Sequence, residues 1–269
     1  MPKEMHPLLV FVIAALPAHL VALVSQNKKF IEAVSKLRES NETMNGDLPF
    51  AIPFHVSIQV HMGEEYYHLC GGSIIHSQII MTAAHCFHEN HPMAMLSVVA
   101  GVQKFSVAPK PRYAISLVVR HRYYWSLRRF DIALVKLKEP LPIDGTHIDT
   151  VDYRLTENME DNKEAYLIVW DRNSTNLGIV DFTTINTKDC KKMGFVYVTK
   201  LVLCAYSTMG RGACEGDSGG ALLSPDLTKQ LGILSYGRMP CQSNRIYVYT
   251  SMVPVVGWID EQIKRIVGK

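Results

Sequence analysis

The sequence has no large excess of charge of either sign. Among its 269 residues are 28 Lys and Arg against 25 Asp and Glu, a formal net charge of +3. A balance this even singles out neither nucleic acid nor an acidic membrane surface as a partner. We expect the local clusters Arg120-His121-Arg122 and Arg128-Arg129 to be solvated loop charges. The composition therefore predicts no nucleic-acid partner.

The sequence also lacks the clustered ligands of a metal site. It contains no CxxC or HxxxH pattern that would bring thiolates and imidazoles together at zinc spacing. It has no repeat with a period of 20 to 50 residues and no low-complexity tract. We therefore expect no metal and no cofactor, and an ordinary globular domain.

Long apolar runs are scarce as well. The run from Leu8 to Val24 is broken by Pro17 and His19, so its uninterrupted stretches are shorter than the ~20 residues of a membrane-spanning helix. A basic residue before the run and polar residues after it are typical of a secretory signal peptide. We expect residues 1–25 to be a signal peptide and residues 26–46 a propeptide or flexible segment. The protein would then be secreted, without membrane contact after signal removal.

Six cysteines behind such a leader indicate an oxidising compartment and up to three disulfides, in a pairing that the count alone leaves open. The sequons that begin at Asn41 and Asn173 are typical of a secreted glycoprotein. Both features agree with the expectation of secretion.

From residue 47 onward, short runs rich in β-branched and aromatic residues recur between turn signals. The runs are Pro53–Val60, Ser73–Met81, Leu96–Val102, Tyr113–Val119, Ile132–Leu137, Ala165–Trp170, Leu231–Tyr236 and Ile246–Thr250. Many short strands and few helical periods predict an all-β barrel or sandwich. One helix is expected at the C-terminus, where Val255, Trp258, Ile259, Ile263 and Ile266 share a face. We expect it to pack on the domain without taking part in chemistry.

Three segments each carry a residue type that acyl transfer needs. They are TAAHC (82–86), DIALVKL (131–137) and GDSGG (216–220). A serine hydroxyl is a weak nucleophile at neutral pH, so it needs an imidazole to take its proton and a carboxylate to hold that imidazole in the right tautomer. His85, Asp131 and Ser218 supply one candidate for each role.

These segments resemble the signature segments of the chymotrypsin-like (trypsin-fold) serine peptidases, in that family's chain order of His, Asp and Ser. The likeness extends from about Pro53 to Trp258. It implies two six-stranded antiparallel β-barrels with a C-terminal α-helix, and a peptidase domain over residues 47–269. It also implies a secreted serine endopeptidase that forms an acyl-enzyme on protein or peptide substrates, with protein protease inhibitors as further candidate partners.

The resemblance assigns supporting roles. Gly216 and Ser218 would donate the oxyanion-hole N–H groups, and Ser235 would hydrogen-bond the triad carboxylate. Asp217 would pair with an N-terminal amine freed by activation. The implied disulfides are Cys70–Cys86, Cys190–Cys204 and Cys214–Cys241.

The specificity pocket also follows from the resemblance. Its base would fall on Gly212 and Ala213, which offer no carboxylate to pair with Arg or Lys. Tyr247 would shorten the slot, while Gly237 would keep the opposite wall open. We expect small or medium apolar residues before the cleaved bond, with an occluded pocket as the alternative.

The chain departs from the family near the activation site. The stretch Glu42-Thr43-Met44-Asn45-Gly46 stands where the family has a basic residue followed by Ile-Val-Gly-Gly, so we expect any mature N-terminus to lie elsewhere than Thr43. Asp171 likewise replaces a glycine after the tryptophan of that region. Two alternatives stay open: a catalytically silent secreted homologue that binds partners, and the weaker reading of GDSGG as the G-x-S-x-G of an α/β-hydrolase.

Overall fold

A computed structural model describes most of the chain from residue 52 onward. The described ranges are 52–87, 91–103, 111–124, 130–157, 161–170, 177–195, 199–207, 212–237 and 245–268. The expected signal peptide, propeptide, activation stretch and both sequons lie outside these residues, and so do Asp171 and Cys241.

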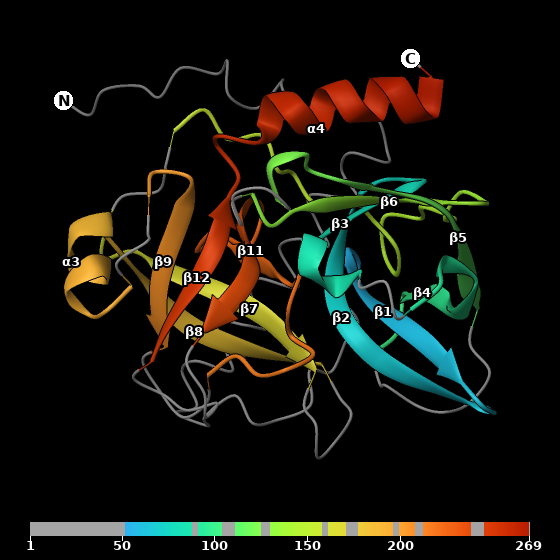
Figure 1. Cartoon of the computed structure of the whole chain (residues 1–269), viewed down its shortest axis with the longest axis horizontal. Coiled ribbons are helices and arrows are strands. Elements are labelled where there is room, and N and C mark those ends of the chain that lie inside the picture. Colours follow the sequence, from blue (N-terminus) through green and yellow to red (C-terminus); the bar gives the residue numbers. More distant parts are fainter. Residues whose placement is uncertain are drawn as a thin grey trace, which may run out of the picture.

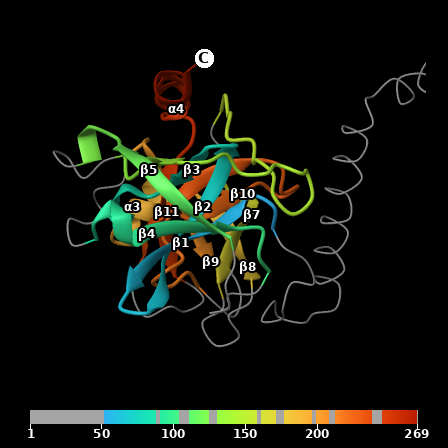
Figure 2. The same cartoon turned by 90° about the vertical axis from the view of Figure 1, so that its right-hand side faces the viewer.

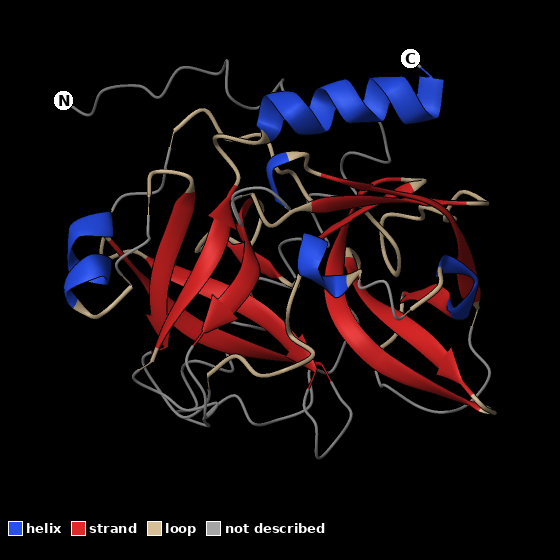
Figure 3. Ribbon diagram, in the orientation of Figure 1, coloured by secondary structure: helices blue, strands red, loops and turns tan. Residues whose placement is uncertain are grey.

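The described strands form two closed antiparallel barrels of six strands each, as Figures 1 and 3 show. In barrel order the first contains β1 (His55–Met62), β2 (Glu65–His76), β3 (Ile79–Thr82), β6 (Ala133–Leu137), β5 (Arg112–Arg120) and β4 (Leu96–Ala100). The second contains β10 (Ala221–Leu223), β11 (Gln230–Gly237), β12 (Ile246–Ser251), β9 (Val202–Ser207), β8 (Leu177–Ile185) and β7 (Glu164–Trp170). The predicted two-barrel fold is confirmed.

Strand β7 shows how the alternation of side chains fills two cores at once. Ala165, Leu167 and Val169 lie in the core of the second barrel. Their neighbours Tyr166, Ile168 and Trp170 lie in the larger core that extends through the first barrel. Because successive side chains of a strand point to opposite faces, a strand that is apolar throughout suits a position between two cores.

Several elements were not expected from the sequence. The run Ser73–Met81 is in fact the end of β2 and the first three residues of β3, joined by a turn after a register shift between Ile74 and His76. Strands β8, β9 and β10 were missed: β10 has only three residues, and polar residues interrupt β8. Helix α3 (Thr187–Lys192) spans six residues, too few to show helical periodicity, and the Asn186 side chain caps it.

The C-terminal helix is confirmed as α4 (Val256–Ile263), which continues in a wider π-type coil over Lys264–Gly268. Figures 1 and 2 show it along one edge of the molecule. The hydroxyl of Tyr153 donates to Asp260 Oδ1 at 2.7 Å, and Lys136 Nζ donates to the carbonyl of Ile266 at 2.6 Å. These bonds anchor the middle of α4 and the π-type segment that follows it. In the part of the chain that the structure describes, no helix is long and apolar enough to cross a bilayer.

A buried histidine on β1, His55, makes the stability of the folded protein depend on pH. His55 is 3% exposed, and neither of its ring nitrogens has a hydrogen-bond partner. Burial, reinforced by the nearby His68, lowers the pKa of His55 from 6.5 to about 3. The imidazole therefore stays neutral in the folded protein well above pH 3.

This histidine predicts acid sensitivity. Below pH ~6.5 the unfolded chain takes up a proton at His55 that the folded chain refuses until about pH 3, so stability falls as the pH drops through this window. By pH 5 the loss is about 2 kcal/mol. His55→Phe should flatten the fall in melting temperature between pH 7 and pH 5. His147→Gln, which changes an exposed histidine, should keep the wild-type slope; equal slopes for wild type and His55→Phe would contradict the prediction.

Candidate active site

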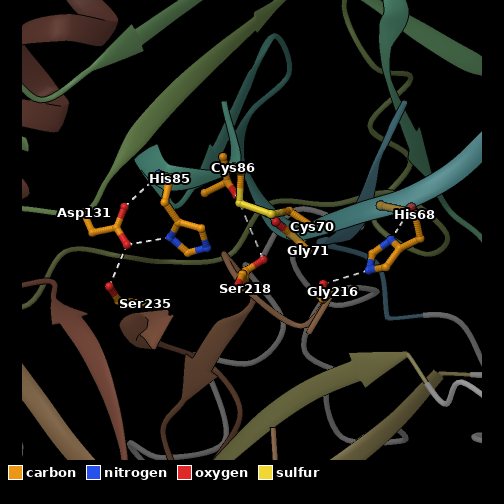
Figure 4. The surroundings of a disulfide bond; sticks show 11 residues. His68, Cys70, Gly71, His85, Cys86, Asp131, Gly216, Ser218 and Ser235 are labelled. Carbon is orange, nitrogen blue, oxygen red and sulfur yellow. Dashed lines mark hydrogen bonds and ion pairs between the residues drawn. A yellow bond between two sulfur atoms is a disulfide. The ribbon is translucent and has the colours of Figure 1, made fainter. Parts of the chain in front are cut away.

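The site lies between the two barrels. His85 and Asp131 come from loops of the first barrel and are hydrogen-bonded to each other. His85 sits in a single 3-10 turn (Ala84–Cys86) that follows β3, and Asp131 lies just before β6. His85 Nδ1 is 2.7 Å from Asp131 Oδ2, and the backbone N–H of His85 donates to Oδ1 at 2.9 Å (Figure 4). The two bonds fix both the position and the tautomer of the imidazole, with the proton on Nδ1 facing the carboxylate.

The second barrel also holds Asp131. Ser235 on β11 donates its hydroxyl to Asp131 Oδ2 at 2.6 Å, as the resemblance implied. Thr250 on β12 donates its hydroxyl to the backbone carbonyl of Asp131 at 2.9 Å. The role of Thr250 was missed, because nothing in the local sequence marks a threonine whose partner lies 119 residues away.

Ser218 lies in the turn before β10, and its backbone is pinned to the first barrel. The N–H of Gly71 donates to the carbonyl of Ser218 at 2.8 Å. Figure 4 shows Ser218 on the side of His85 away from Asp131. Both residues are described, and no hydrogen bond joins the serine hydroxyl to the imidazole. Hydrogen bonds of this kind are often long in ligand-free sites and shorten when substrate is bound.

The glycine after the serine is required by space as well as by conformation. Gly219 has a φ of +81°, where a side chain is strained. A Cβ built on it would lie 2.1 Å from the hydroxyl oxygen of Thr82 and 2.5 Å from the carbonyl oxygen of Gly71. Thr82 in turn donates its hydroxyl to that Gly71 carbonyl at 2.8 Å. The serine turn therefore touches the first barrel's backbone directly.

The expected oxyanion residue Gly216 is held by a histidine that the sequence analysis did not single out. His68 Nε2 is 2.8 Å from the carbonyl oxygen of Gly216, and its other ring nitrogen is 2.8 Å from the hydroxyl of Ser57. Figure 4 shows the first of these contacts across the two barrels. This carbonyl belongs to the peptide unit between Gly216 and Asp217, so the contact fixes the orientation of that unit. His68 stands two residues before Cys70, and this position is the one signal that could have indicated it.

Asp217 is buried, with 4% of its surface exposed, and its carboxylate accepts backbone N–H groups from both sides. Oδ2 accepts from Cys214 at 2.7 Å, and Oδ1 accepts from Trp170 at 3.3 Å. The carboxylate therefore joins the end of β7 to the loop that carries Gly216. The expected pairing of Asp217 with a freed N-terminus stays a prediction.

Two of the three expected disulfides fall within the described residues. Cys70 is bonded to Cys86, and Cys190 to Cys204. Cys214 is also disulfide-bonded, and its expected partner Cys241 lies outside the described residues. Ligand atoms of Cys70, His85 and Cys86 lie within 4.8 Å of one another. Since the two sulfurs are bonded to each other, they offer no thiolates to a metal ion at this place.

A pocket with a volume of about 200 Å³ opens beside Ser218. Its walls include Ala213, Gly237 and Tyr247, and Gly212 next to Ala213 is buried. Tyr247 is 2% exposed and pairs with Gly237 in the β11–β12 ladder. A Cβ on Gly237 would lie 2.2 Å from the Tyr247 ring, so the ring fills the space that a side chain at this position would take.

This packing decides how Gly237 and Tyr247 shape the pocket. Gly237 does not leave its wall open, because the tyrosine ring covers it. Nor does the ring point outward: Phe182 packs edge-on against Tyr247, with ring centroids 5.5 Å apart. The pocket is therefore shallow and largely apolar where the ring lies.

A fold of two antiparallel barrels with a histidine, an aspartate and a serine between them defines a class: the trypsin-fold serine peptidases. The Trypsin family model matches residues 43–259, and the chain belongs to this family. The chain is 29% identical to Hypodermin-B of Hypoderma lineatum over 222 residues, which are 79% of this chain and 83% of that protein. In fold it is similar to neuropsin, a serine protease expressed in the limbic system of mouse brain, with a TM-score of 0.68 and 21% identity over 80% of this chain and 96% of that one.

The contact between Gly219 and the first barrel generates a prediction. Gly219→Ala should displace the serine turn, because its methyl group cannot fit beside Thr82 and Gly71. We expect a folded protein with a lower melting temperature and a rate of Ser218 acylation reduced about 100-fold, as for a misplacement of about 1 Å. Gly257→Ala is the matched control, because open space surrounds that glycine. An acylation rate within threefold of wild type in Gly219→Ala would show that the turn tolerates the methyl group.

Proposed function

We propose that this chain is a secreted serine endopeptidase in which His85, Asp131 and Ser218 form the catalytic triad. The observation that carries the proposal is the Asp131 carboxylate, which orients His85 at 2.7 Å and is itself held by Ser235 at 2.6 Å. Family membership supports a serine peptidase in general, and the substrates would be proteins or peptides.

The proposed reaction gives each group of the site a defined role. As Ser218 Oγ bonds to the substrate carbonyl carbon, its proton passes to Nε2 of His85. The imidazolium then gives that proton to the leaving amine as the C–N bond breaks, which leaves an acyl-enzyme. Water repeats the sequence in the second half of the reaction and releases the acid. The backbone N–H groups of Gly216 and Ser218 would stabilise the oxyanion in both halves.

The support for Asp131 as the orienting group is its hydrogen-bonding pattern. The hydrogen bonds that its carboxylate accepts come from groups with a defined place in the site: the backbone and ring of His85, and the hydroxyl of Ser235. A carboxylate held by these donors is placed to stabilise the imidazolium that forms during acylation. It does not need to accept the proton itself.

The triad assignment predicts the effect of three substitutions on peptide hydrolysis. Ser218→Ala and His85→Ala should abolish hydrolysis while secretion and folding stay intact. Asp131→Asn should lower kcat by ~10⁴, because the amide favours the wrong imidazole tautomer. The measurement is hydrolysis of a fluorogenic peptide library by the purified secreted proteins. Activity of Ser218→Ala within tenfold of wild type would overturn the assignment, and an inactive wild type would favour a silent binding protein.

We further propose a preference for small or medium apolar residues before the cleaved bond. The buried residues Gly212, Ala213 and Tyr247 offer no carboxylate to pair with a basic side chain inside the pocket, and the one carboxylate in the lining, that of Glu215, is exposed to solvent. Burying an unpaired cation is strongly unfavourable, so Arg and Lys are disfavoured. The Tyr247 ring limits the size of the side chain that can enter.

This specificity predicts that removing the ring widens the pocket. Tyr247→Gly should raise kcat/KM on Phe or Leu substrates relative to Ala substrates by about 10-fold or more, the range of selectivity that an apolar pocket provides. Tyr249→Phe is the matched control: it keeps a ring in the same core and removes a buried hydroxyl that has no hydrogen-bond partner. A positional-scanning library would give both profiles. Preferred cleavage after Arg or Lys in the wild type would refute the proposed pocket.

A further inference from the structure

The residue before Asp131 has an unusual backbone conformation. Phe130 has a φ of +56°, in the left-handed region that bulky residues rarely adopt. Such conformations persist where the surrounding structure enforces them, and they cluster at functional sites. Asp131 is 9% exposed, so the strain lies directly against a buried carboxylate.

A tight turn with Asp131 at its centre begins at Phe130, the residue with the left-handed backbone. The N–H of Ile132 donates to the carbonyl of Phe130 at 2.8 Å, which closes a three-residue ring around Asp131. The Ile132 carbonyl accepts from the backbone N–H of His121 at 3.1 Å. A turn of this size leaves Asp131 little freedom, so the direction of its carboxylate depends on Phe130.

The side chain of Phe130 is held by the same histidine. The rings of Phe130 and His121 lie 4.3 Å apart between centroids at an angle of 31°, and Trp258 of α4 meets the His121 ring edge-on at 4.9 Å. His121 is 7% exposed, and burial, with a smaller effect of Arg122, lowers its pKa. A neutral imidazole therefore lies between the two aromatic rings. His121 thus touches the turn twice, through its backbone and through its ring.

We propose that the packed rings of Phe130 and His121 form a clamp that holds the left-handed conformation of Phe130 and thereby positions Asp131 toward His85. Both are positioning residues, since neither reaches the groups that react. The inference rests on the proposed function for its effect on catalysis. Its effect on the hydrogen bond between His85 and Asp131 does not depend on turnover.

The test compares variants that remove the ring packing with one that restores it. His121→Leu keeps the buried volume and the backbone N–H but removes the flat ring, and Phe130→Ala removes the other ring. His121→Phe restores an aromatic partner. Tyr153→Phe is the matched control, because it weakens the anchoring of α4 through Asp260 without touching the turn.

The first readout is kinetic. His121→Leu and Phe130→Ala should lower kcat about 10- to 100-fold with a small change in KM, as for a misaligned catalytic group. The acid limb of the pH profile of kcat/KM should move to lower pH, because a displaced carboxylate stabilises the His85 imidazolium less. His121→Phe should recover at least half of the lost kcat. Tyr153→Phe should lower the melting temperature and leave kcat and the acid limb unchanged.

The second readout does not require an active enzyme. In ¹⁵N-histidine-labelled protein, the proton between His85 Nδ1 and Asp131 Oδ2 should give a far-downfield NMR line, assigned by its loss in His85→Gln. The line should shift upfield or broaden in His121→Leu and Phe130→Ala and return in His121→Phe. An unchanged line in folded His121→Leu overturns the clamp. A wild type that shows the line but hydrolyses no peptide would overturn the proposed function and leave the clamp supported.

Discussion

A buried carboxylate is stable in a protein only where hydrogen-bond donors replace the water it has lost, and Asp131 finds such donors in both barrels. The first barrel supplies the backbone and ring of His85, and the second supplies Ser235. The same residue's backbone carbonyl accepts from Thr250 of β12. The orientation of His85 therefore depends on how the two barrels sit against each other.

Other hydrogen bonds between the two barrels lie near the same site. The carbonyl of Ser218 accepts from Gly71 at 2.8 Å, and the carbonyl of Gly216 is 2.8 Å from the ring of His68. Deeper in the interface, Ser73 donates its hydroxyl to Gln230 at 2.7 Å. Each bond joins a group in the first barrel to one in the second. The site is thus assembled by the interface, and a change that loosens the interface should impair the chemistry before it unfolds either barrel.

The sequence predicted those parts of the structure that short, contiguous segments determine. TAAHC, DIALVKL and GDSGG carry their residues in short frames, and the apolar runs of β1, β6, β7 and β12 mark strands that the structure contains. The pairing of Cys70 with Cys86 and of Cys190 with Cys204 came from the resemblance, since a count of cysteines cannot choose partners.

What the sequence could not supply was contact between distant segments. The support from His68 joins residues 148 positions apart, and that from Thr250 spans 119. No periodicity encodes such pairs. The pocket shows the same limit: Gly237 by itself predicts an open wall, yet the ring of Tyr247 lies against it because the two residues are paired across β11 and β12. The packing of the C-terminal helix was expected, but its partner was not: Trp258 contacts the ring of His121 beside the Asp131 turn.

The central claim is that the groups gathered at the barrel interface activate one serine. The most direct measurement treats the secreted protein with a fluorophosphonate and maps the adduct by peptide mass spectrometry, with the N-terminus of the labelled species sequenced in parallel. The account predicts a single adduct on the Ser218 Oγ, which is absent from Ser218→Ala and forms far more slowly in Asp131→Asn. Absence of any adduct on the folded wild type, or labelling that persists in Ser218→Ala, would contradict it.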